Sequence, residues 1–387
     1  MRGGNSHVRI LQVSGVFCDA GGGGVGDHVC SLGSRLVKLG HTVEVITHTR
    51  APPKREHRGL VVHRVPISRI AGARYFQWGR DAGLFVKQLL KTTDFDLVHA
   101  HTTSMAFPLY YDGRPPLLIT CHGTSVDPVH GIPRRIALAA IERRYYAKAA
   151  RVIAVSETVK AELARRGVPN DHVEVIPNGT DNTRFEGIPR DKLAARALLG
   201  IKPDETVALF VGTLSERKGF GVLIQAMRRT LGDHQKPYHC LIAGDGPIGP
   251  QLRRLAASLP GVVALGFVQE SVLGRLYSAS DFLVCPSLYE GMPTVVLDAL
   301  GFGLPVIASD IPSLREILTT DCAVFVRRND PTSLSQAIEC LGSSHERLMR
   351  MSEAAVKESK RFQWDLLVER LVRVYEQVTG WHQSETT

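Results

Sequence analysis

The stretch SLYEGMPTVVLDALGFGLPVIASD, residues 287–310, contains a pattern typical of a helix start. Proline is favoured in the first helical turn, where its missing N–H would have no partner in any case. The residues at this predicted start are Gly291, Met292, Pro293 and Thr294. The N–H groups around them would face an anion at the positive end of the helix dipole, a geometry that binds a diphosphate.

Two carboxylates flank this predicted anion site. Glu290 lies just before the turn, where it would reach the group attached to the diphosphate. Asp298 lies one helical turn after Thr294, on the same face, because residues four apart are neighbours on a helix. We therefore expect Asp298 to accept hydrogen bonds from neighbouring hydroxyls, such as those of a ribose.

A second candidate phosphate site lies upstream in GTLSERKGF, residues 212–220. This segment follows a strand-like run and brings Arg217 and Lys218 to the start of another predicted helix. Charge-assisted hydrogen bonds from such side chains to phosphate oxygens are short and strong. Both segments predict that the second half of the chain binds a phosphorylated ligand.

The elements that must position these residues alternate between strands and helices. In the first half, short apolar runs that end in turn residues predict strands at residues 8–14, 41–47, 96–101, 116–123, 150–156 and 172–179. A second series of predicted strands follows at residues 206–212, 238–247, 262–268, 281–287 and 304–310. Two such series predict the α/β class, with two doubly wound domains.

The domain boundaries follow from a loss of periodicity. The segment TDNTRFEGIPR separates the two series, and the helix candidate WDLLVERLVRVYEQV comes after both. A chain of 387 residues suits two domains. We predict a first domain at residues 1–187, a second domain at residues 188–365 and a final helical segment at residues 366–387.

A glycine-rich loop follows the first predicted strand, where Gly21, Gly23 and Gly26 have the spacing G-x-G-x-x-G. In a nicotinamide or flavin enzyme, a carboxylate at the end of the second strand binds the ribose hydroxyls. Glu44 instead lies inside that strand, so its side chain would point to one face of the sheet. An NAD-dependent oxidoreductase is an alternative that fails this check, whereas phosphate binding by a glycine turn remains.

Composition limits the class of protein. Apolar residues make up 44% of the chain and charged residues 22%, which is ordinary for soluble globular proteins. The apolar runs are far shorter than the roughly 20 residues of a membrane span. The seven cysteines occur singly, which argues against a zinc knuckle or a disulfide framework. We therefore expect a reduced, cytoplasmic location.

The excess positive charge lies in the first half. Residues 1–187 contain 25 Lys and Arg against 16 Asp and Glu, which accounts for the whole net charge of +9. A basic segment at residues 132–151 interleaves arginine and lysine with apolar residues. This asymmetry suggests either a lipid surface or a phosphorylated acceptor, with a merely solvated basic surface as the alternative. Nucleic acid is not expected, because no recognised binding motif accompanies the charge.

These motifs resemble those of the retaining glycosyltransferases of family 4, the group 1 family, over nearly the whole chain. The matching segments are GTLSERKG, GDGP, GFV, VSETVKAEL, IPNGTD and the stretch around Glu290. The resemblance implies the GT-B fold, in which two Rossmann-like domains face a central cleft. It also implies an acceptor on the first domain, a nucleotide-sugar on the second, and a final helix with Trp364 that crosses back to the first domain.

The resemblance assigns roles to charged residues. Glu290 takes the position of a glutamate that contacts donor-sugar hydroxyls, and Lys218 takes that of a lysine that binds the diphosphate. Asp298 stands where the family pattern has a second glutamate, and its carboxylate would still bind the ribose. Many members carry arginine where this chain has Thr213, so Arg217 is expected to supply the second positive charge.

The remaining expected site residues lie at strand ends. His122 matches a family histidine that points into the cleft near the reacting carbon. The other expected donor-binding residues are Gly212, Gly244 and the base-bordering turn of Gly266, Phe267 and Val268. The glycines expected to line the cleft near the donor phosphates and the acceptor are Gly22, Gly23 and Gly24.

His99 and His101 have an alternating spacing that could mimic a metal-binding pair. Zinc sites in proteins combine histidine with cysteine or carboxylate ligands in most cases. No carboxylate cluster accompanies this pair in the sequence. A structural role is therefore favoured, and no metal site is predicted.

The expected reaction transfers a hexosyl group from a UDP- or GDP-type sugar to an acceptor hydroxyl with retained configuration, without metal or cofactor. Helix N-termini, Lys218 and Arg217 would neutralise the leaving diphosphate, while Glu290 and His122 would hold the sugar. A GT-B nucleotide-sugar epimerase remains an alternative, although the extra acid–base carboxylates that it needs are not evident. The expected partners are the sugar donor, a glycan, lipid-linked or small-molecule acceptor, and an anionic membrane in peripheral contact at its inner face.

Overall fold

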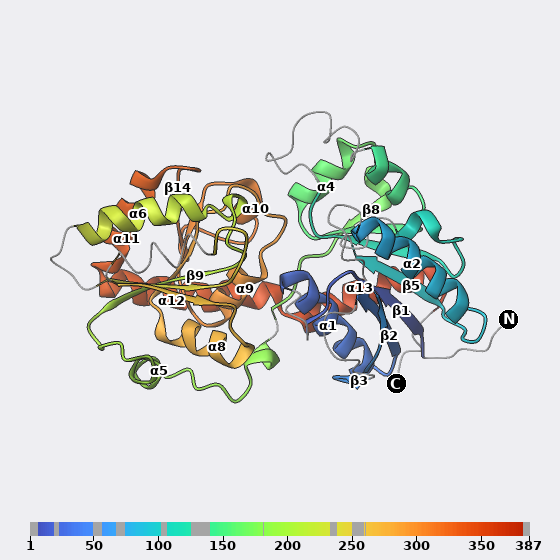
Figure 1. The fold of residues 1–387 in the computed structure, drawn as a ribbon, viewed down its shortest axis with the longest axis horizontal. Coiled ribbons are helices and arrows are strands. Elements are labelled where there is room, and N and C mark those ends of the chain that lie inside the picture. The colour runs from blue at the N-terminus through green and yellow to red at the C-terminus, as the bar shows by residue number, and fades with distance from the viewer. Residues whose placement is uncertain are drawn as a thin grey trace. The chain divides into compact units, whose positions relative to one another are not determined.

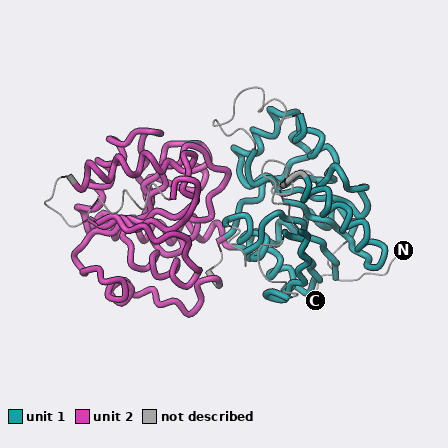
Figure 2. The backbone as a smooth tube through the Cα atoms, in the orientation of Figure 1, with its two compact units in different colours: residues 1–179, 364–387 teal, residues 180–363 magenta. Residues whose placement is uncertain are grey.

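The structure is a computed structural model that forms two compact units, which we describe separately (Figure 2). Unit 1 comprises residues 1–179 and 364–387, and unit 2 comprises residues 180–363. The described residues are 7–18, 23–48, 56–66, 74–101, 107–124, 140–180, 182–232, 238–249, 259 and 261–381.

Unit 1 contains an eight-stranded sheet with the order β3-β4-β2-β1-β5-β6-β7-β8 (Figure 1). The strands are β1 (Arg9–Val13), β2 (Thr42–His48), β3 (Glu56–His57), β4 (Leu60–Val65), β5 (Leu97–His101), β6 (Leu117–Cys121), β7 (Arg151–Ala154) and β8 (Val173–Val175). All neighbouring strands are parallel except β3 and β4. The strand order reverses at β1, which pairs with β2 on one side and β5 on the other.

The helices of unit 1 cover this sheet and include one from the end of the chain. Those whose bounds lie within the described residues are α1 (Gly23–Lys38), α2 (Arg74–Leu89), α4 (Glu157–Ala164) and α13 (Trp364–Thr379), with 3-10 turns η3 (Phe107–Tyr110) and η4 (Asn170–His172). Leu367, Leu371 and Tyr375 of α13 are buried in one core with Ile10 and Leu32. The expectation that the last helix crosses back to the first domain is therefore confirmed.

Unit 2 contains a six-stranded parallel sheet with the order β11-β10-β9-β12-β13-β14. The strands are β9 (Thr206–Val211), β10 (Tyr238–Ala243), β11 (Val262–Gly266), β12 (Phe282–Cys285), β13 (Val306–Ser309) and β14 (Ala323–Val326). The helices whose bounds lie within the described residues are α5 (Lys192–Leu199), α6 (Phe220–Gly232), α8 (Glu270–Ala279), α9 (Thr294–Gly301), α10 (Pro312–Arg315), α11 (Pro331–Gly342) and α12 (His345–Ser359). The 3-10 turns are η5 (Asn182–Phe185), η6 (Glu216–Lys218) and η7 (Lys360–Phe362). The α/β class with two doubly wound domains is confirmed.

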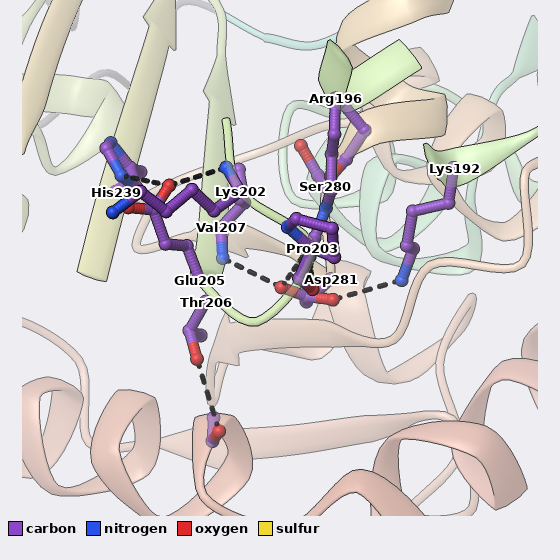
Figure 3. Close-up of polar contacts among 12 residues, drawn as sticks. Lys192, Arg196, Lys202, Pro203, Glu205, Thr206, Val207, His239, Ser280 and Asp281 are labelled. Carbon is purple, nitrogen blue, oxygen red and sulfur yellow. Dashed lines mark hydrogen bonds and ion pairs between the residues drawn. The ribbon is translucent and has the colours of Figure 1, made fainter. Parts of the chain in front are cut away.

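An ion-pair network holds the amino ends of two central strands of unit 2 (Figure 3). Asp281, which precedes β12, accepts hydrogen bonds from the Val207 backbone N–H at 2.7 Å and from Arg196 Nη2 at 2.7 Å. Lys192 Nζ lies 3.0 Å from its second carboxylate oxygen. Arg196 also donates through Nε to the Ala279 carbonyl. The network ties α5 to β9 and β12, and its charges are matched by both ion pairs and backbone groups.

The chain crosses between the units earlier than the predicted boundary at residues 187/188. Thr180 N–H donates to the Phe362 carbonyl at 2.7 Å, so both crossing points of the chain lie side by side. Phe185 then packs against Tyr277 and Phe302 of unit 2. Residues after Thr180 therefore belong to unit 2, because their apolar side chains are buried there. The second crossing lies before Trp364, two residues ahead of the predicted helical segment.

Two further observations bear on the composition. Among the helices that the structure describes, none is both long and apolar enough to cross a membrane. All seven cysteines are free thiols.

Candidate active site

The predicted phosphate-binding segments of unit 2 lie where the strand order of its sheet reverses. β9 pairs with β10 on one side and with β12 on the other. Ligands of open α/β sheets bind beyond the carboxyl ends of the strands at such a reversal. The loop after β9 leads to η6, and the loop after β12 leads to α9. The sheet topology therefore brings both segments to the same edge.

Glu290 is the centre of a buried charged cluster at this edge. Its Oε1 accepts hydrogen bonds from Lys218 Nζ at 2.6 Å and from the Ser287 hydroxyl at 2.7 Å. Arg217 Nη1 lies 3.8 Å from Oε2 of the same carboxylate and donates to the Tyr289 carbonyl at 3.4 Å. The side chain of Glu290 is 5% exposed, that of Lys218 15% and that of Arg217 34%. The carboxylate is thus fixed, while both cations reach solvent.

Backbone contacts hold the two loops together. Gly219 has φ +67, and a Cβ at this position would lie 1.8 Å from the Pro286 carbonyl oxygen. The Leu288 N–H also donates to the Arg217 carbonyl at 2.8 Å. Only glycine satisfies both the left-handed conformation and the close approach. The glycine of the KG pair is therefore what allows Lys218 to reach Glu290.

The strand-end glycines allow a second close approach of backbones. Gly244 has φ +144, and a Cβ there would lie 1.9 Å from the Gly212 carbonyl oxygen. The Gly244 N–H donates to the Gly266 carbonyl at 2.7 Å. The residues predicted to surround the donor therefore lie at adjacent strand ends. Thr213 is exposed beside Gly212.

Phe267 follows Gly266 and is 69% exposed, although it is a large apolar side chain. Val268 beside it is partly buried. An exposed aromatic ring at a strand end offers a face on which a planar base stacks. The predicted position of the base-bordering turn is therefore compatible with this geometry.

Helix α9 begins as the sequence predicts, with Pro293 at its N-cap and Thr294 as its first residue. Within the described part of the chain, no side chain caps this N-terminus. Gly291 and Met292 precede it and are buried. The end of the helix dipole therefore lies next to Glu290 without a side-chain acceptor, as an anion site requires.

Asp298 is buried on α9 and forms an ion pair that the sequence analysis missed. Arg184 Nη1 lies 3.5 Å from Asp298 Oδ2, and Arg184 Nε lies 3.2 Å from Glu270 Oε1. The side chain of Arg184 is only 7% exposed. Arg184 lies in residues 180–190, which have no strand or helix periodicity, so no sequence pattern indicated it. Ser287 was not predicted either, although it begins the segment of residues 287–310. Both residues orient the predicted carboxylates.

In unit 1, His122 belongs to a cluster of imidazoles from three elements. His122 follows β6, His101 ends β5 and His28 lies on α1. His101 Nδ1 lies 3.2 Å from His122 Nε2. The ring centroids of His28 and His122 are 4.6 Å apart, and those of His28 and His101 are 5.4 Å apart. The sequence paired His101 with His99, whereas the structure also joins it to His28 and His122.

His99 has the structural role that the sequence predicted. Its Nδ1 lies 2.8 Å from the Tyr375 hydroxyl on α13, and its Nε2 lies 2.7 Å from the Thr120 hydroxyl. Its ring also stacks on His101 at a centroid distance of 4.5 Å. His99 therefore connects the sheet to the returning helix and supports the ring of His101.

Burial keeps these imidazoles neutral. Desolvation lowers the pKa of His28 to about 4, against which a hydrogen bond with Asn178 acts to raise it. Desolvation, with repulsion from neighbouring imidazoles, lowers the pKa of His99 to about 3 and the pKa values of His101 and His122 well below 6.5. At neutral pH the cluster therefore carries lone pairs and no positive charge.

The glycine loop of unit 1 is described only in part. Gly22 lies outside the described residues, while Gly23 and Gly24 are the first residues of α1. Glu44, on which the oxidoreductase alternative was tested, lies on β2 and pairs with His63 at 2.6 Å and Arg9 at 3.0 Å. The hydrogen bond with His63 lowers the pKa of this carboxyl most. Glu44 is thus committed to the sheet face, as its mid-strand position predicted.

Comparison with known sequences covers both units. Residues 22–184 match the profile of Glycosyltransferase Family 4, and residues 205–344 match that of Glycosyl transferases group 1. An uncharacterized glycosyltransferase of Methanocaldococcus jannaschii is 30% identical over 373 residues, which cover 91% of this chain and 94% of that protein. A D-inositol 3-phosphate glycosyltransferase of Nocardia farcinica is 27% identical over 387 residues, with 91% and 84% covered.

Solved structures share the fold over nearly the whole chain. Sucrose-phosphate synthase from Thermosynechococcus elongatus superposes with a TM-score of 0.81 at 21% identity, covering 96% of this chain and 99% of the other. Anabaena HepE, solved in complex with UDP and glucose, gives a TM-score of 0.78 at 19% identity, with 96% and 100% covered. These neighbours confirm the predicted GT-B fold. With its two profile matches and its archaeal relative, the chain belongs to glycosyltransferase family 4, the glycosyl transferases group 1.

Proposed function

We propose that the protein is a retaining, metal-independent hexosyltransferase that uses a UDP- or GDP-type sugar donor. The observation that carries the proposal is the convergence of Lys218 and Arg217 on Glu290 beside the N-terminus of α9. Two cationic side chains and a helix dipole at one strand-order reversal form a site for a dianionic leaving group. HepE, the structural neighbour solved with UDP and glucose, supports this type of donor.

Each part of the donor binds a different group of residues in this site. The diphosphate contacts the α9 N-terminus, Lys218 and Arg217, which exchange part of their pairing with Glu290 for phosphate oxygens. Asp298, held by Arg184, accepts hydrogen bonds from the ribose hydroxyls. The base lies at the turn of Gly266, Phe267 and Val268. Gly212, Thr213 and Gly244 lie at the strand ends, where the donor contacts the backbone closely.

Catalysis depends on orientation and on stabilising the leaving group. Glu290 contacts the sugar hydroxyls, and His122, neutral because of its lowered pKa, hydrogen bonds to the sugar near the reacting carbon. The C1–O bond to the diphosphate breaks while the acceptor oxygen attacks the same face. The departing phosphate oxygen takes the acceptor's proton. Fixed contacts to the sugar restrict it to this approach, which preserves the configuration.

The acceptor binds unit 1, and we propose that it carries a phosphate. The net charge of +9 in the first 187 residues favours an anionic partner. Two curated relatives are named for such acceptors, a D-inositol 3-phosphate glycosyltransferase and a phosphatidyl-myo-inositol mannosyltransferase. Gly23 and Gly24 lie at the start of α1, where the helix dipole favours an anion.

The decisive experiment measures nucleotide release from a panel of UDP- and GDP-sugars with inositol phosphates and lipid-linked sugars as acceptors. We expect release from one donor only when an acceptor is present, with an α-configured donor giving an α-configured product. In parallel, UDP or GDP should raise the melting temperature and NAD should not. Formation of an epimerised sugar without an acceptor would instead identify an epimerase, and stabilisation by NAD would support the oxidoreductase.

The proposal places the protein in the cytoplasm, in peripheral contact with anionic lipid. Arg143 and Arg144 are exposed in a helical stretch that includes residues 140–146, whereas Tyr145 and Tyr146 are buried. Arg134 and Arg135 of the same segment lie outside the described residues. Each basic residue near an anionic bilayer contributes about 1 kcal/mol. Sedimentation with anionic and neutral vesicles at low salt tests this contact, and equal recovery in both supernatants would exclude it.

A further inference from the structure

The imidazoles of His28, His101 and His122 bring three possible metal-ligand atoms close together. Each offers a nitrogen atom, and these three atoms all lie within 4.8 Å of one another. His101 Nδ1 and His122 Nε2 are 3.2 Å apart. Two nitrogens that bind a tetrahedral Zn²⁺ at its usual distance lie about 3.3 Å apart. The spacing therefore suits either a nitrogen–nitrogen hydrogen bond or a shared metal ion.

The surroundings of the cluster favour ligation. Metal ions bind neutral imidazole, so protons compete with the metal at ordinary histidines. Here His28 and His101 are buried and His122 is partly buried. The rings are also supported from behind, since His99 stacks on His101 and is itself held by Thr120 and Tyr375. Such outer contacts orient the ligands of metal sites.

We propose that His28, His101 and His122 bind one Zn²⁺ ion, with its fourth position open to water or an anion. Three histidines and a free position match the coordination of zinc sites that accept an exogenous ligand. The consequence for activity rests on the proposed function, in which His122 contacts the donor sugar. A metal-bound His122 is unavailable to the sugar, so zinc inhibits transfer reversibly.

A second cluster in the same unit must be separated from this one. Cys18, Cys30 and His57 also offer ligand atoms within 4.8 Å of one another, and Cys18 Sγ lies 3.3 Å from His57 Nε2. Thiols release protons when they bind a metal, whereas neutral imidazoles do not. The thiolate also produces a sulfur-to-cobalt charge-transfer band that a histidine site lacks. Cys18→Ser therefore serves as the background for the experiment.

The test titrates the Cys18→Ser protein with Co²⁺ at pH 7 and follows its visible absorption. We expect the intense d–d bands of four-coordinate Co²⁺ at one ion per chain, lost on addition of Zn²⁺. His28→Phe, which keeps the aromatic packing, should abolish the bands, and His101→Asn provides a second variant. His345→Ala, at an exposed position on α12, is the control and should leave them unchanged.

Each result decides the inference independently of the glycosyltransfer assay. Absence of the four-coordinate bands in a protein whose melting temperature matches the parent would overturn the zinc site. Bands that survive in both His28→Phe and His101→Asn would overturn it as well. Where transfer is detected, Zn²⁺ should suppress it and a chelator should restore it. A protein that binds Co²⁺ but transfers no sugar would contradict the proposed function and leave the zinc site standing.

Discussion

Unit 2 contains two carboxylates that each attract two basic side chains. They lie at opposite ends of the same central strands of its sheet. Asp281 lies at the amino ends of β9 and β12 with Arg196 and Lys192. Glu290 lies beyond the carboxyl ends of the same strands with Lys218 and Arg217 as its basic partners. The ion-pair chemistry is the same, but the surroundings differ.

In the Asp281 network, backbone groups form hydrogen bonds with both the carboxylate and its buried arginine. Asp281 accepts from the Val207 N–H, and Arg196, whose side chain is 4% exposed, donates to the carbonyls of Ala279 and Pro203. The Glu290 cluster instead lies beside the N-terminus of α9, which no side chain caps within the described residues. We infer that the Asp281 network stabilises the fold, whereas the Glu290 cluster, next to an uncapped helix N-terminus, binds a ligand.

The largest effect on stability is expected at the Asp281 network. Asp281→Ala leaves Arg196 buried without its carboxylate, and breaking such a pair costs about 3–5 kcal/mol of unfolding free energy. Lys192→Ala is the matched control, because this side chain is 46% exposed and surface pairs contribute about 1 kcal/mol or less. Urea unfolding measures both, and equal losses for the two variants would show that the buried pair is no more important for stability than the exposed one.

Glu290→Gln should impair sugar transfer without weakening nucleotide binding. Transfer should fall by at least roughly 100-fold, because contacts to the sugar are misplaced, while nucleotide affinity holds or increases as Lys218 and Arg217 lose their competing carboxylate. Steady-state kinetics and calorimetry with UDP or GDP measure the two quantities. Transfer within a few-fold of the parent would remove Glu290 from the catalytic site.

Asp298→Ala tests the ribose position with a smaller effect. Hydrogen bonds to a charged group contribute about 1.5–3 kcal/mol, which corresponds to a loss of nucleotide affinity of roughly ten- to 150-fold. Glu270→Ala removes the more exposed partner of Arg184 and should leave affinity unchanged. Asp298→Glu should retain binding. Unchanged affinity in Asp298→Ala, measured by calorimetry, would exclude the ribose role.

The neutral imidazoles of unit 1 are buried titratable groups as well, and they predict how the stability of the protein depends on pH. Below pH 6.5 the unfolded chain protonates His28, whereas the folded chain does so only near pH 4. The unfolded state therefore binds more protons, and stability falls as the pH drops through this window, by about 1.4 kcal/mol per pH unit for one imidazole. His28→Phe should flatten the slope by that amount in urea unfolding at several pH values. An unchanged slope in His28→Phe would show that His28 already ionises in the folded protein.

Local patterns in the sequence were sufficient for the frame of both units. Short apolar runs before glycine turns predicted β1, β9 and β12, because such runs are long enough only for buried strands. The strands β3, β4 and β14 were not predicted. β4 (Leu60–Val65) alternates buried and exposed residues only in part, so its pattern is weak although the strand lies between β3 and β2.

The sequence alone also determined that Lys218, Glu290 and Asp298 would follow parallel strands, whose carboxyl ends share one edge. Only the tertiary structure decided which of these side chains touch. Lys218 and Glu290 are 72 residues apart and meet at 2.6 Å, and Arg184 reaches Asp298 from a segment without periodicity. His28, His101 and His122 likewise come from a helix and two strand ends. A local sequence pattern indicates which face of an element is buried. The partner on that face depends on the spatial order of the strands in the sheet.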